Sequence, residues 1–188
     1  MFRGVKFIMT NLPKLSIGFD RFKLAKLIFI GLAFIIIGVL FISKGIEAIN
    51  KAESTLKVIL LIGLAALTFS FSTPNTFVWI KKLFSKNEGL LLSEEGFIDR
   101  SGSYNYGLVL WSDVKSISTY DVAGQDSISI GVLDKNKYRE KGGIFNKLIF
   151  DFNVKYSGTP IHITSKSLKI DNEELASKLS EYFSASKI

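Results

Sequence analysis

Two uncharged apolar runs in the first half of the chain constrain its fold more than any other feature. The first run, residues 27–42, holds sixteen residues without a charge, and thirteen of them are Leu, Ile, Phe or Val. The second run, residues 58–80, holds twenty-three uncharged residues. A helix needs about 17 to 25 apolar residues to cross a bilayer, and a helix that is apolar on every face would otherwise need a large protein around it. We therefore predict an integral membrane protein with a transmembrane hairpin over residues 27–83, whose spans cover about 27–43 and 58–80.

Pro74 interrupts the second run. Proline removes a helical hydrogen bond, so we expect a kink or a helix end near Thr73. Ser72, Pro74 and Asn75 are suited to a small polar site within the membrane, but Trp79 and the lysines that follow it are typical of the membrane interface. We favour the interpretation that this segment approaches the lipid headgroups.

Small residues indicate how the two spans pack. Gly31, Gly38 and Gly45 recur every seven residues in the first span. Such glycines let two helix backbones approach closely, and we expect them to face small residues of the second span: Gly63, Ala66 and Ser70. The same glycine face is equally suited to a homo-oligomer, so the sequence leaves both arrangements open.

The distribution of lysine and arginine predicts the orientation of the hairpin. Six of these residues precede the first span and three follow the second within residues 81–86, whereas the loop of residues 43–57 holds three, together with Glu47 and Glu53. Short segments rich in Lys and Arg stay on the cytoplasmic side. We predict a multi-pass membrane protein with both termini in the cytoplasm and with residues 1–26 as a basic N-terminal segment.

The net charge of +7 belongs to the membrane-flanking half of the chain. Residues 1–88 hold 12 Lys+Arg against 4 Asp+Glu, whereas residues 89–188 hold 12 against 13. A nucleic-acid-binding domain would concentrate basic residues on its folded surface, so we expect no nucleic-acid partner. The chain has no cysteine, which excludes disulfide bonds and thiolate metal sites.

Beyond residue 88 the apolar runs give way to short alternating segments separated by turn residues, which is typical of an antiparallel sheet. Asp171 is suited to cap a C-terminal helix with an apolar stripe at Leu175, Leu179, Tyr182 and Phe183. We predict a domain over residues 89–188 that contains this helix and seven short strands, at residues 90–92, 97–99, 108–111, 114–120, 128–132, 161–164 and 168–170.

Residues 134–157 fit two structures. As a strand, apolar and polar side chains alternate from Leu148 to Tyr156; as a helix, Leu148, Phe152 and Tyr156 share one face. A helix here would either pack on the domain, which we favour, or lie against the bilayer as an amphipathic segment.

Several short motifs follow the two apolar runs in a fixed order: Gly89-Leu90-Leu91-Leu92, Glu95-Gly96-Phe97-Ile98-Asp99, Leu110-Trp111-Ser112-Asp113-Val114, and Gly158-Thr159-Pro160-Ile161-His162-Ile163 ahead of Leu168-Lys169-Ile170. The chain from Leu24 onward resembles a family of uncharacterised bacterial inner-membrane proteins whose soluble part is similar to bacterial pleckstrin-homology (PH) domains. The resemblance implies a partly open seven-stranded antiparallel barrel closed at one end by the C-terminal helix, and it favours a helix for residues 134–157. It implies no reaction. The expected fold class is an α+β membrane protein in which the transmembrane hairpin precedes a PH-like cytoplasmic domain.

His162 is the only histidine of the chain and lies between two isoleucines on a predicted strand. A catalytic histidine needs a nucleophile or a carboxylate within reach, and no sequence pattern marks one, so we expect a structural or surface role. The sequence also lacks a phosphate-binding loop and a nucleophile elbow. We expect no enzymatic activity, no cofactor and no bound metal.

Two sets of residues are candidates for binding. The aromatic residues Tyr104, Tyr106 and Trp111 are suited to contact a protein partner, although Trp111 is also suited to anchor the core. A basic stripe is suited to face anionic lipid: Lys135, Lys137, Arg139, Lys141 and Lys147.

The first hairpin turn of the domain weighs against lipid headgroup recognition. PH-like domains commonly carry basic residues there, whereas this turn carries Glu94 and Glu95, whose charge repels phosphates. We therefore expect a membrane-tethered, non-catalytic interaction module that binds an unknown protein, and lipid sensing through residues 135–147 is the alternative.

Overall fold

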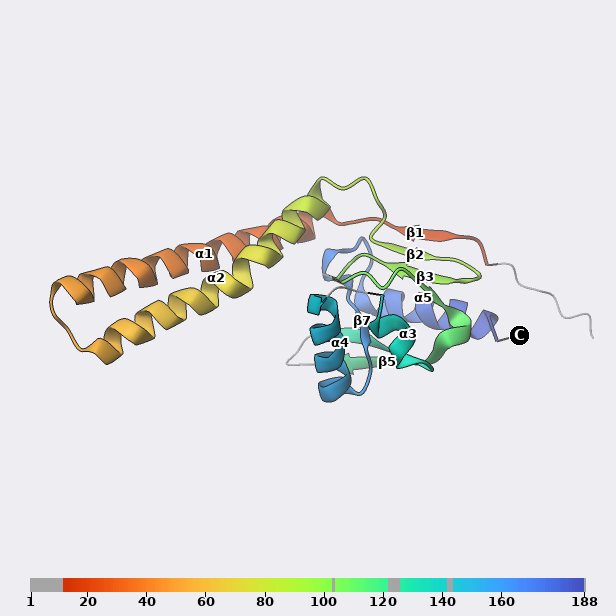
Figure 1. Ribbon diagram of the computed structural model, residues 1–188. Coiled ribbons are helices and arrows are strands. Elements are labelled where there is room, and N and C mark those ends of the chain that lie inside the picture. The colour runs from red at the N-terminus through yellow and green to blue at the C-terminus, as the bar shows by residue number, and fades with distance from the viewer. Residues whose placement is uncertain (1–11, 103, 122–125, 142–143, 188) are drawn as a thin grey trace, which may run out of the picture. The chain divides into compact units, whose positions relative to one another are not determined.

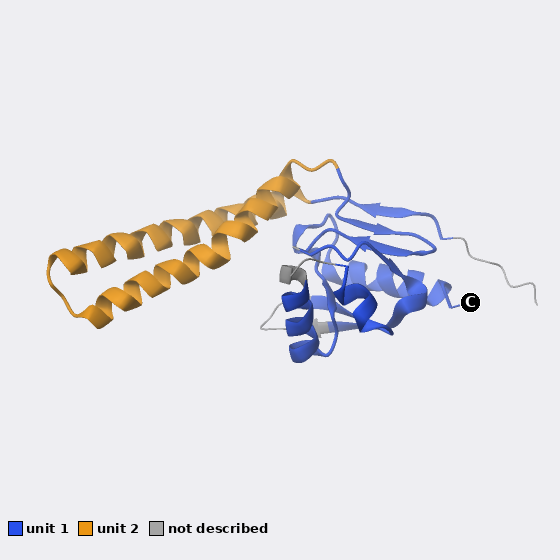
Figure 2. Cartoon of the chain, viewed as in Figure 1, with its two compact units in different colours: residues 1–19, 87–188 blue, residues 20–86 orange. Residues whose placement is uncertain are grey.

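The computed structural model describes residues 12–102, 104–121, 126–141 and 144–187 (Figure 1). The chain divides into two compact units (Figure 2). One unit is the helical segment Asp20–Lys86. The other contains Asn87–Ile188 together with the residues that precede Asp20.

The helical unit is a hairpin of α1 (Arg21–Asn50) and α2 (Thr55–Leu83). The Asp20 side chain begins α1, because its Oδ1 accepts hydrogen bonds from the backbone N–H groups of Phe22 and Lys23 at 2.8 and 3.0 Å. Both helices are long and apolar enough to cross a membrane, and only 11% of the residues in the most apolar segment of each are buried. Leu, Ile and Phe side chains therefore cover the outside of the hairpin, where a bilayer would solvate them.

The glycine face of α1 packs on α2. Gly31, Gly38 and Gly45 are all buried. A Cβ atom added at Gly31 would lie 2.0 Å from Thr76 Oγ1, and one at Gly38 would lie 2.7 Å from Thr68 Oγ1. The expected glycine contact between the two spans is confirmed. Because α2 covers this face within the chain, the glycines present no free surface to a second copy, as the homo-oligomer alternative would need.

The matching surface of α2 was predicted wrongly. A Cβ at Gly63 would meet nothing within 4 Å, and Ala66 and Ser70 are exposed. The buried residues of α2 are instead Ala65, Ser72 and Thr76. Successive residues of a helix point about 100° apart. A predicted set of contact residues that is shifted by one position therefore lies on a neighbouring face.

Pro74 lies inside α2, which continues to Leu83. A helix end near Thr73 is therefore excluded. Polar side chains around the proline bond to their own helix: the Ser72 hydroxyl donates to the Thr68 carbonyl at 2.5 Å, and Asn75 Nδ2 donates to the Phe71 carbonyl at 2.7 Å. These bonds give the Ser72 and Asn75 side chains partners within the apolar helix.

The first sheet of the domain has four antiparallel strands in the order β1-β2-β3-β4. They are β1 (Leu15–Ile17), β2 (Leu90–Leu92), β3 (Gly96–Asp99) and β4 (Leu108–Leu110). β1 lies in the segment expected to be only a basic N-terminal extension, and it pairs with β2 in the register Leu15–Leu92 and Ile17–Leu90. The helical hairpin is therefore inserted in sequence between two paired strands of one sheet.

The second sheet has the order β5-β6-β7 and is also antiparallel. Its strands are β5 (Val114–Asp121), β6 (Asp126–Val132) and β7 (Ile161–Ile163). The predicted seventh strand at residues 168–170 is wrong, because Leu168 makes only an isolated bridge to Phe19. The seventh strand is β1. In the part of the chain that the structure describes, the two sheets do not close into one barrel.

Within residues 134–157 the structure describes two helices, α3 (Lys135–Arg139) and α4 (Ile144–Ser157). This confirms the helical alternative. The C-terminal helix is confirmed as α5 (Asn172–Ala185), capped by the Asp171 carboxylate, which accepts from the Glu174 N–H at 2.8 Å. Side chains from both sheets and α5 form one core, which includes Leu90, Phe97, Ile130, Ile163 and Leu175.

Candidate interaction site

Trp111 and Tyr106 belong to the core of the domain. Trp111 is 3% exposed, packs against Phe97 with ring centroids 5.2 Å apart, and donates a hydrogen bond from Nε1 to the Ser93 carbonyl at 2.8 Å. The Tyr106 hydroxyl donates to the Pro160 carbonyl at 3.3 Å, and burial raises the pKa of Tyr106 to about 12. Trp111 therefore anchors the core, which was the alternative to partner binding. Of the three candidate partner-binding aromatics, only Tyr104 is half-buried and offers surface.

The predicted basic stripe is largely paired with acids. Lys137 Nζ lies 2.6 Å from Asp113 Oδ2, and Lys147 Nζ lies 2.5 Å from Glu140 Oε2. Arg139 binds both oxygens of Asp151 at 2.7 Å, a bidentate pair. The hydrogen bond from Arg139 holds the pKa of Asp151 below its ordinary value. These carboxylates cancel much of the positive field that an anionic lipid would meet.

The remaining two lysines of the stripe bond to backbone carbonyls. Lys141 Nζ donates to Leu108 at 3.1 Å and lies 4.5 Å from the centroid of the Tyr138 ring. Lys135 Nζ donates to Gly158 at 3.4 Å. Among the described residues, these two lysines have no carboxylate within ion-pair distance.

His162 joins β6, β7 and the end of α4 through a hydrogen-bonded cluster. Its Nε2 lies 3.2 Å from the Thr159 carbonyl and 2.8 Å from Ser157 Oγ, and its Nδ1 lies 3.2 Å from Ser129 Oγ. A carbonyl only accepts, so we assign the proton to Nε2, which leaves Nδ1 to accept from Ser129.

This arrangement does not prepare Ser157 for nucleophilic attack. The Ser157 hydroxyl donates to the carbonyls of Asn153 or Thr159, at 2.7 and 3.0 Å, and Nε2 faces it with a proton rather than a lone pair. Burial also lowers the pKa of His162, which favours the neutral ring. The cluster fastens α4 to the second sheet, which agrees with the structural role expected for this histidine.

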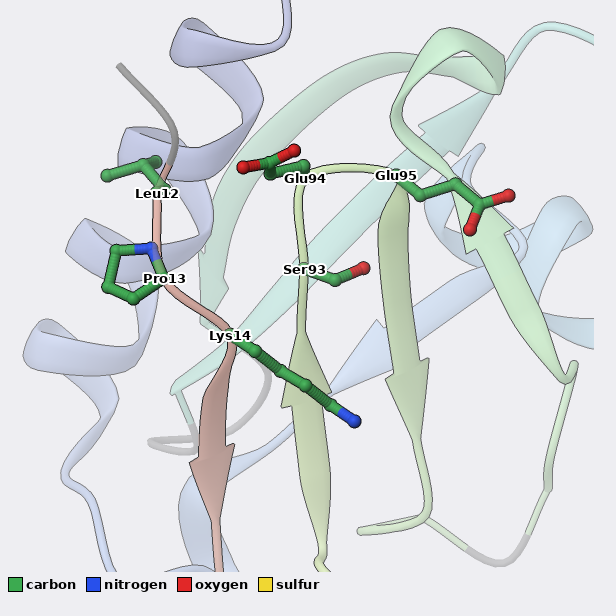
Figure 3. A pocket seen from close by; sticks show the side chains of 6 residues that line it. All are labelled: Leu12, Pro13, Lys14, Ser93, Glu94 and Glu95. Carbon is green, nitrogen blue, oxygen red and sulfur yellow. The ribbon is translucent and has the colours of Figure 1, made fainter.

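A hollow of about 380 Å³ lies beside the β2–β3 turn. Figure 3 shows the six residues that line it: Leu12, Pro13, Lys14, Ser93, Glu94 and Glu95. Glu94 projects from the turn toward Leu12 and Pro13, whereas Glu95 projects to the opposite side (Figure 3). Both glutamates are exposed, and no ion pair joins either one to another described residue.

The core holds both walls of this hollow in place. On the turn side, the Ser93 carbonyl accepts from Trp111 Nε1. On the N-terminal side, the Pro13 carbonyl accepts from the Tyr182 hydroxyl. Gly96 closes the turn, and a Cβ there would lie 2.1 Å from the Val109 carbonyl oxygen, so only glycine fits. The hollow is thus a fixed feature of the domain surface.

The two glutamates of the turn are evident in the sequence, but the hollow is not. Its second wall comes from residues 12–14, which lead into β1. The one available signal was the apolar pair Leu15 and Ile17 on either side of Ser16, and three residues are too few to establish an alternating pattern.

No protein-family model, no curated protein and no solved structure matches this chain.

Proposed function

We propose that the protein is a non-catalytic interaction module held at the inner face of the cell membrane. The hairpin α1–α2 spans the bilayer twice and both chain ends lie in the cytoplasm, as the lysine and arginine distribution predicts. In this proposal the two sheets and α5 form a PH-like arrangement, and the domain binds a protein partner at the membrane surface.

The observation that carries this proposal is the insertion of the hairpin between β1 and β2. Only three residues, 18–20, connect β1 to α1, and only six, 84–89, connect α2 to β2. Six extended residues reach about 20 Å, so a bilayer crossed by the hairpin keeps the domain near its surface. A domain fixed in this way meets partners that work at the membrane.

The hollow at the β2–β3 turn is the candidate partner site, and its two carboxylates, against the one ammonium group of Lys14, favour a basic protein segment. Glu94 and Glu95 give the turn a negative field that attracts Lys or Arg side chains and repels lipid phosphates. PH-like domains that bind headgroups commonly carry basic residues at this turn, so the departure here favours a protein over a phosphorylated lipid.

Lipid sensing through residues 135–147 is the second candidate. The observation in its favour is that Lys135 and Lys141 lie near one another in sequence without a carboxylate partner among the described residues. The ion pairs of Lys137, Arg139 and Lys147 disfavour it, because binding phosphate would require these pairs to open.

The test is crosslinking in cells followed by purification of the full-length protein from its own membrane. The informative variant is Glu94→Gln with Glu95→Gln, and the matched control is Glu173→Gln with Glu174→Gln, which changes the charge equally on exposed residues of α5. We expect wild type and control to capture a partner protein in stoichiometric amount. The variant should capture at least about fivefold less of it, since two lost charge contacts weaken binding by about 1 kcal/mol or more. Equal capture by all three proteins would exclude the hollow as the partner site. Recovery of lipid alone would favour lipid sensing through residues 135–147.

A further inference from the structure

Helix α4 is apolar on two opposite faces. Its inner face carries Phe150, which is 2% exposed and belongs to the core. Its outer face carries Leu148, Phe152 and Tyr156, which are 61%, 58% and 65% exposed. These three residues are spaced by four and therefore form one stripe along the helix. The inner face accounts for the packing of α4 on the domain, but the outer stripe has no role in the fold.

Two rings of the outer stripe lie side by side, and a lysine borders them. The rings of Phe152 and Tyr156 lie with centroids 4.3 Å apart. Lys155 Nζ lies 5.8 Å from the centroid of the Tyr156 ring. The carboxylate next to the stripe, Asp151, is bound by Arg139. Arg139 therefore compensates the negative charge of Asp151.

This combination matches the surface of a helix that lies in a membrane interface. Such helices bury leucine and aromatic side chains at the level of the headgroups and the upper acyl chains, with lysines beside them. Tyrosine is enriched at that depth because its ring is apolar and its hydroxyl is polar. An exposed stripe of large apolar residues marks a contact surface rather than ordinary solvent-exposed surface.

The rest of the chain indicates which surface contacts the outer stripe of α4. α1 and α2 are long and apolar enough to cross a membrane, and the connections of three and six residues keep the domain near that membrane. A lipid surface is therefore always present within reach of the domain, whereas a protein or a second copy must be recruited to it.

We propose that the outer face of α4 inserts Leu148, Phe152 and Tyr156 into the interfacial layer of the bilayer that α1 and α2 cross. Lys155 lies at the headgroup level beside them. The inference rests on the membrane-spanning part of the proposed function and is independent of partner binding at Glu94 and Glu95. It also differs from lipid sensing by the basic stripe, because burial of apolar area supplies the attraction and anionic lipid is not required.

The chain contains no cysteine, so single cysteines can be labelled without background. The full-length protein is reconstituted at one copy per nanodisc of phosphatidylcholine, and a nitroxide is attached at Phe152→Cys. Its accessibility to oxygen, which concentrates in lipid, is compared with its accessibility to a water-soluble nickel complex. Leu40→Cys on the outside of α1 is the lipid reference, and Ser177→Cys on α5 is the aqueous reference.

We expect the label at residue 152 to resemble the lipid reference, with nickel accessibility at least about fivefold below that at residue 177. Nickel accessibility equal to that at residue 177 overturns the proposal. Low accessibility to both reagents also overturns it, because the stripe is then covered by protein. If Leu40→Cys itself is accessible to nickel, the membrane anchor and the α4 contact both fail; if only residue 152 is accessible, the α4 contact alone fails.

Discussion

The indole ring of Trp111 and the phenol ring of Tyr182 lie with centroids 6.5 Å apart in the core, and their polar atoms hold opposite walls of the surface hollow. Trp111 Nε1 donates to Ser93 in the β2–β3 turn, and the Tyr182 hydroxyl donates to Pro13 ahead of β1. Two aromatic residues far apart in sequence thus connect the interior of the domain to its candidate partner site.

The Tyr182 hydroxyl fixes the N-terminal wall, so Tyr182→Phe should loosen it. The substitution keeps the ring in the core and removes one hydrogen bond, which stabilises a protein by about 1 kcal/mol. We expect the free energy of unfolding of the domain to fall by about that amount and backbone amide exchange to rise in β1. Chemical denaturation and hydrogen exchange of the full-length protein measure both effects.

The matched control for this change is Ser180→Ala, which removes an exposed hydroxyl from the same helix, α5. It should lower neither the free energy of unfolding nor the protection of the β1 amides. Equal effects of the two substitutions would show that the Tyr182–Pro13 hydrogen bond does not hold β1.

The glycine contact in the hairpin predicts a difference between Gly31→Ala and Gly63→Ala. The added Cβ at Gly31 would lie 2.0 Å from Thr76 Oγ1, whereas the one at Gly63 meets nothing within 4 Å. We expect Gly31→Ala to destabilise the hairpin by about 1 to 3 kcal/mol, the usual cost of overpacking. Gly63→Ala should be neutral or slightly stabilising, because alanine favours a helix over glycine by about 1 kcal/mol.

Unfolding of the purified protein in mixed micelles, followed by circular dichroism, compares these two variants. A larger loss of stability in Gly63→Ala than in Gly31→Ala would contradict the packing of α1 on α2 described here.

How much of this structure was predictable depends on the length of each pattern. The runs at residues 27–42 and 58–80 are long enough to predict α1 and α2, and the stripe at Leu175 and Leu179 predicts α5. By contrast, β1 has only three residues. It forms because the sheet supplies Leu90 and Leu92 as partners, and its own apolar pair, Leu15 and Ile17, is too short a pattern to predict this tertiary contact.

The candidate site was predictable in its acidic half only. Glu94 and Glu95 occupy an evident turn, but the opposing residues Leu12 and Lys14 come from the other side of the inserted hairpin. The sequence also does not predict the ion pairs that neutralise the basic stripe. Arg139 and Asp151 lie twelve residues apart on two different helices, so only the packing of α3 against α4 brings them together.

His162 predicts how the stability of the domain depends on pH. Burial lowers its pKa from the ordinary value of 6.5. The stability that the neutral ring contributes is fully present above the unfolded-state pKa and is lost as the pH falls through the lower, folded-state pKa. We expect the free energy of unfolding of wild type to decrease as the pH falls below about 6.5, more steeply than that of His162→Gln, whose amide cannot titrate.

The NMR signal of the single histidine measures the same pKa directly in the folded protein. A folded-state value at or above 6.5 would contradict the buried, neutral ring and its Nε2 proton.

We propose that the hairpin crosses the membrane and leaves the domain in the cytoplasm. The most direct test is labelling of single cysteines in intact cells with a membrane-impermeant maleimide. Ser54→Cys lies at the exposed start of α2 and makes no side-chain capping bond, and Ser177→Cys lies on the exposed surface of α5. We expect residue 54 to be labelled in intact cells and residue 177 to be labelled only after the membrane is permeabilised. Labelling of residue 177 in intact cells, or of neither residue until permeabilisation, would contradict it.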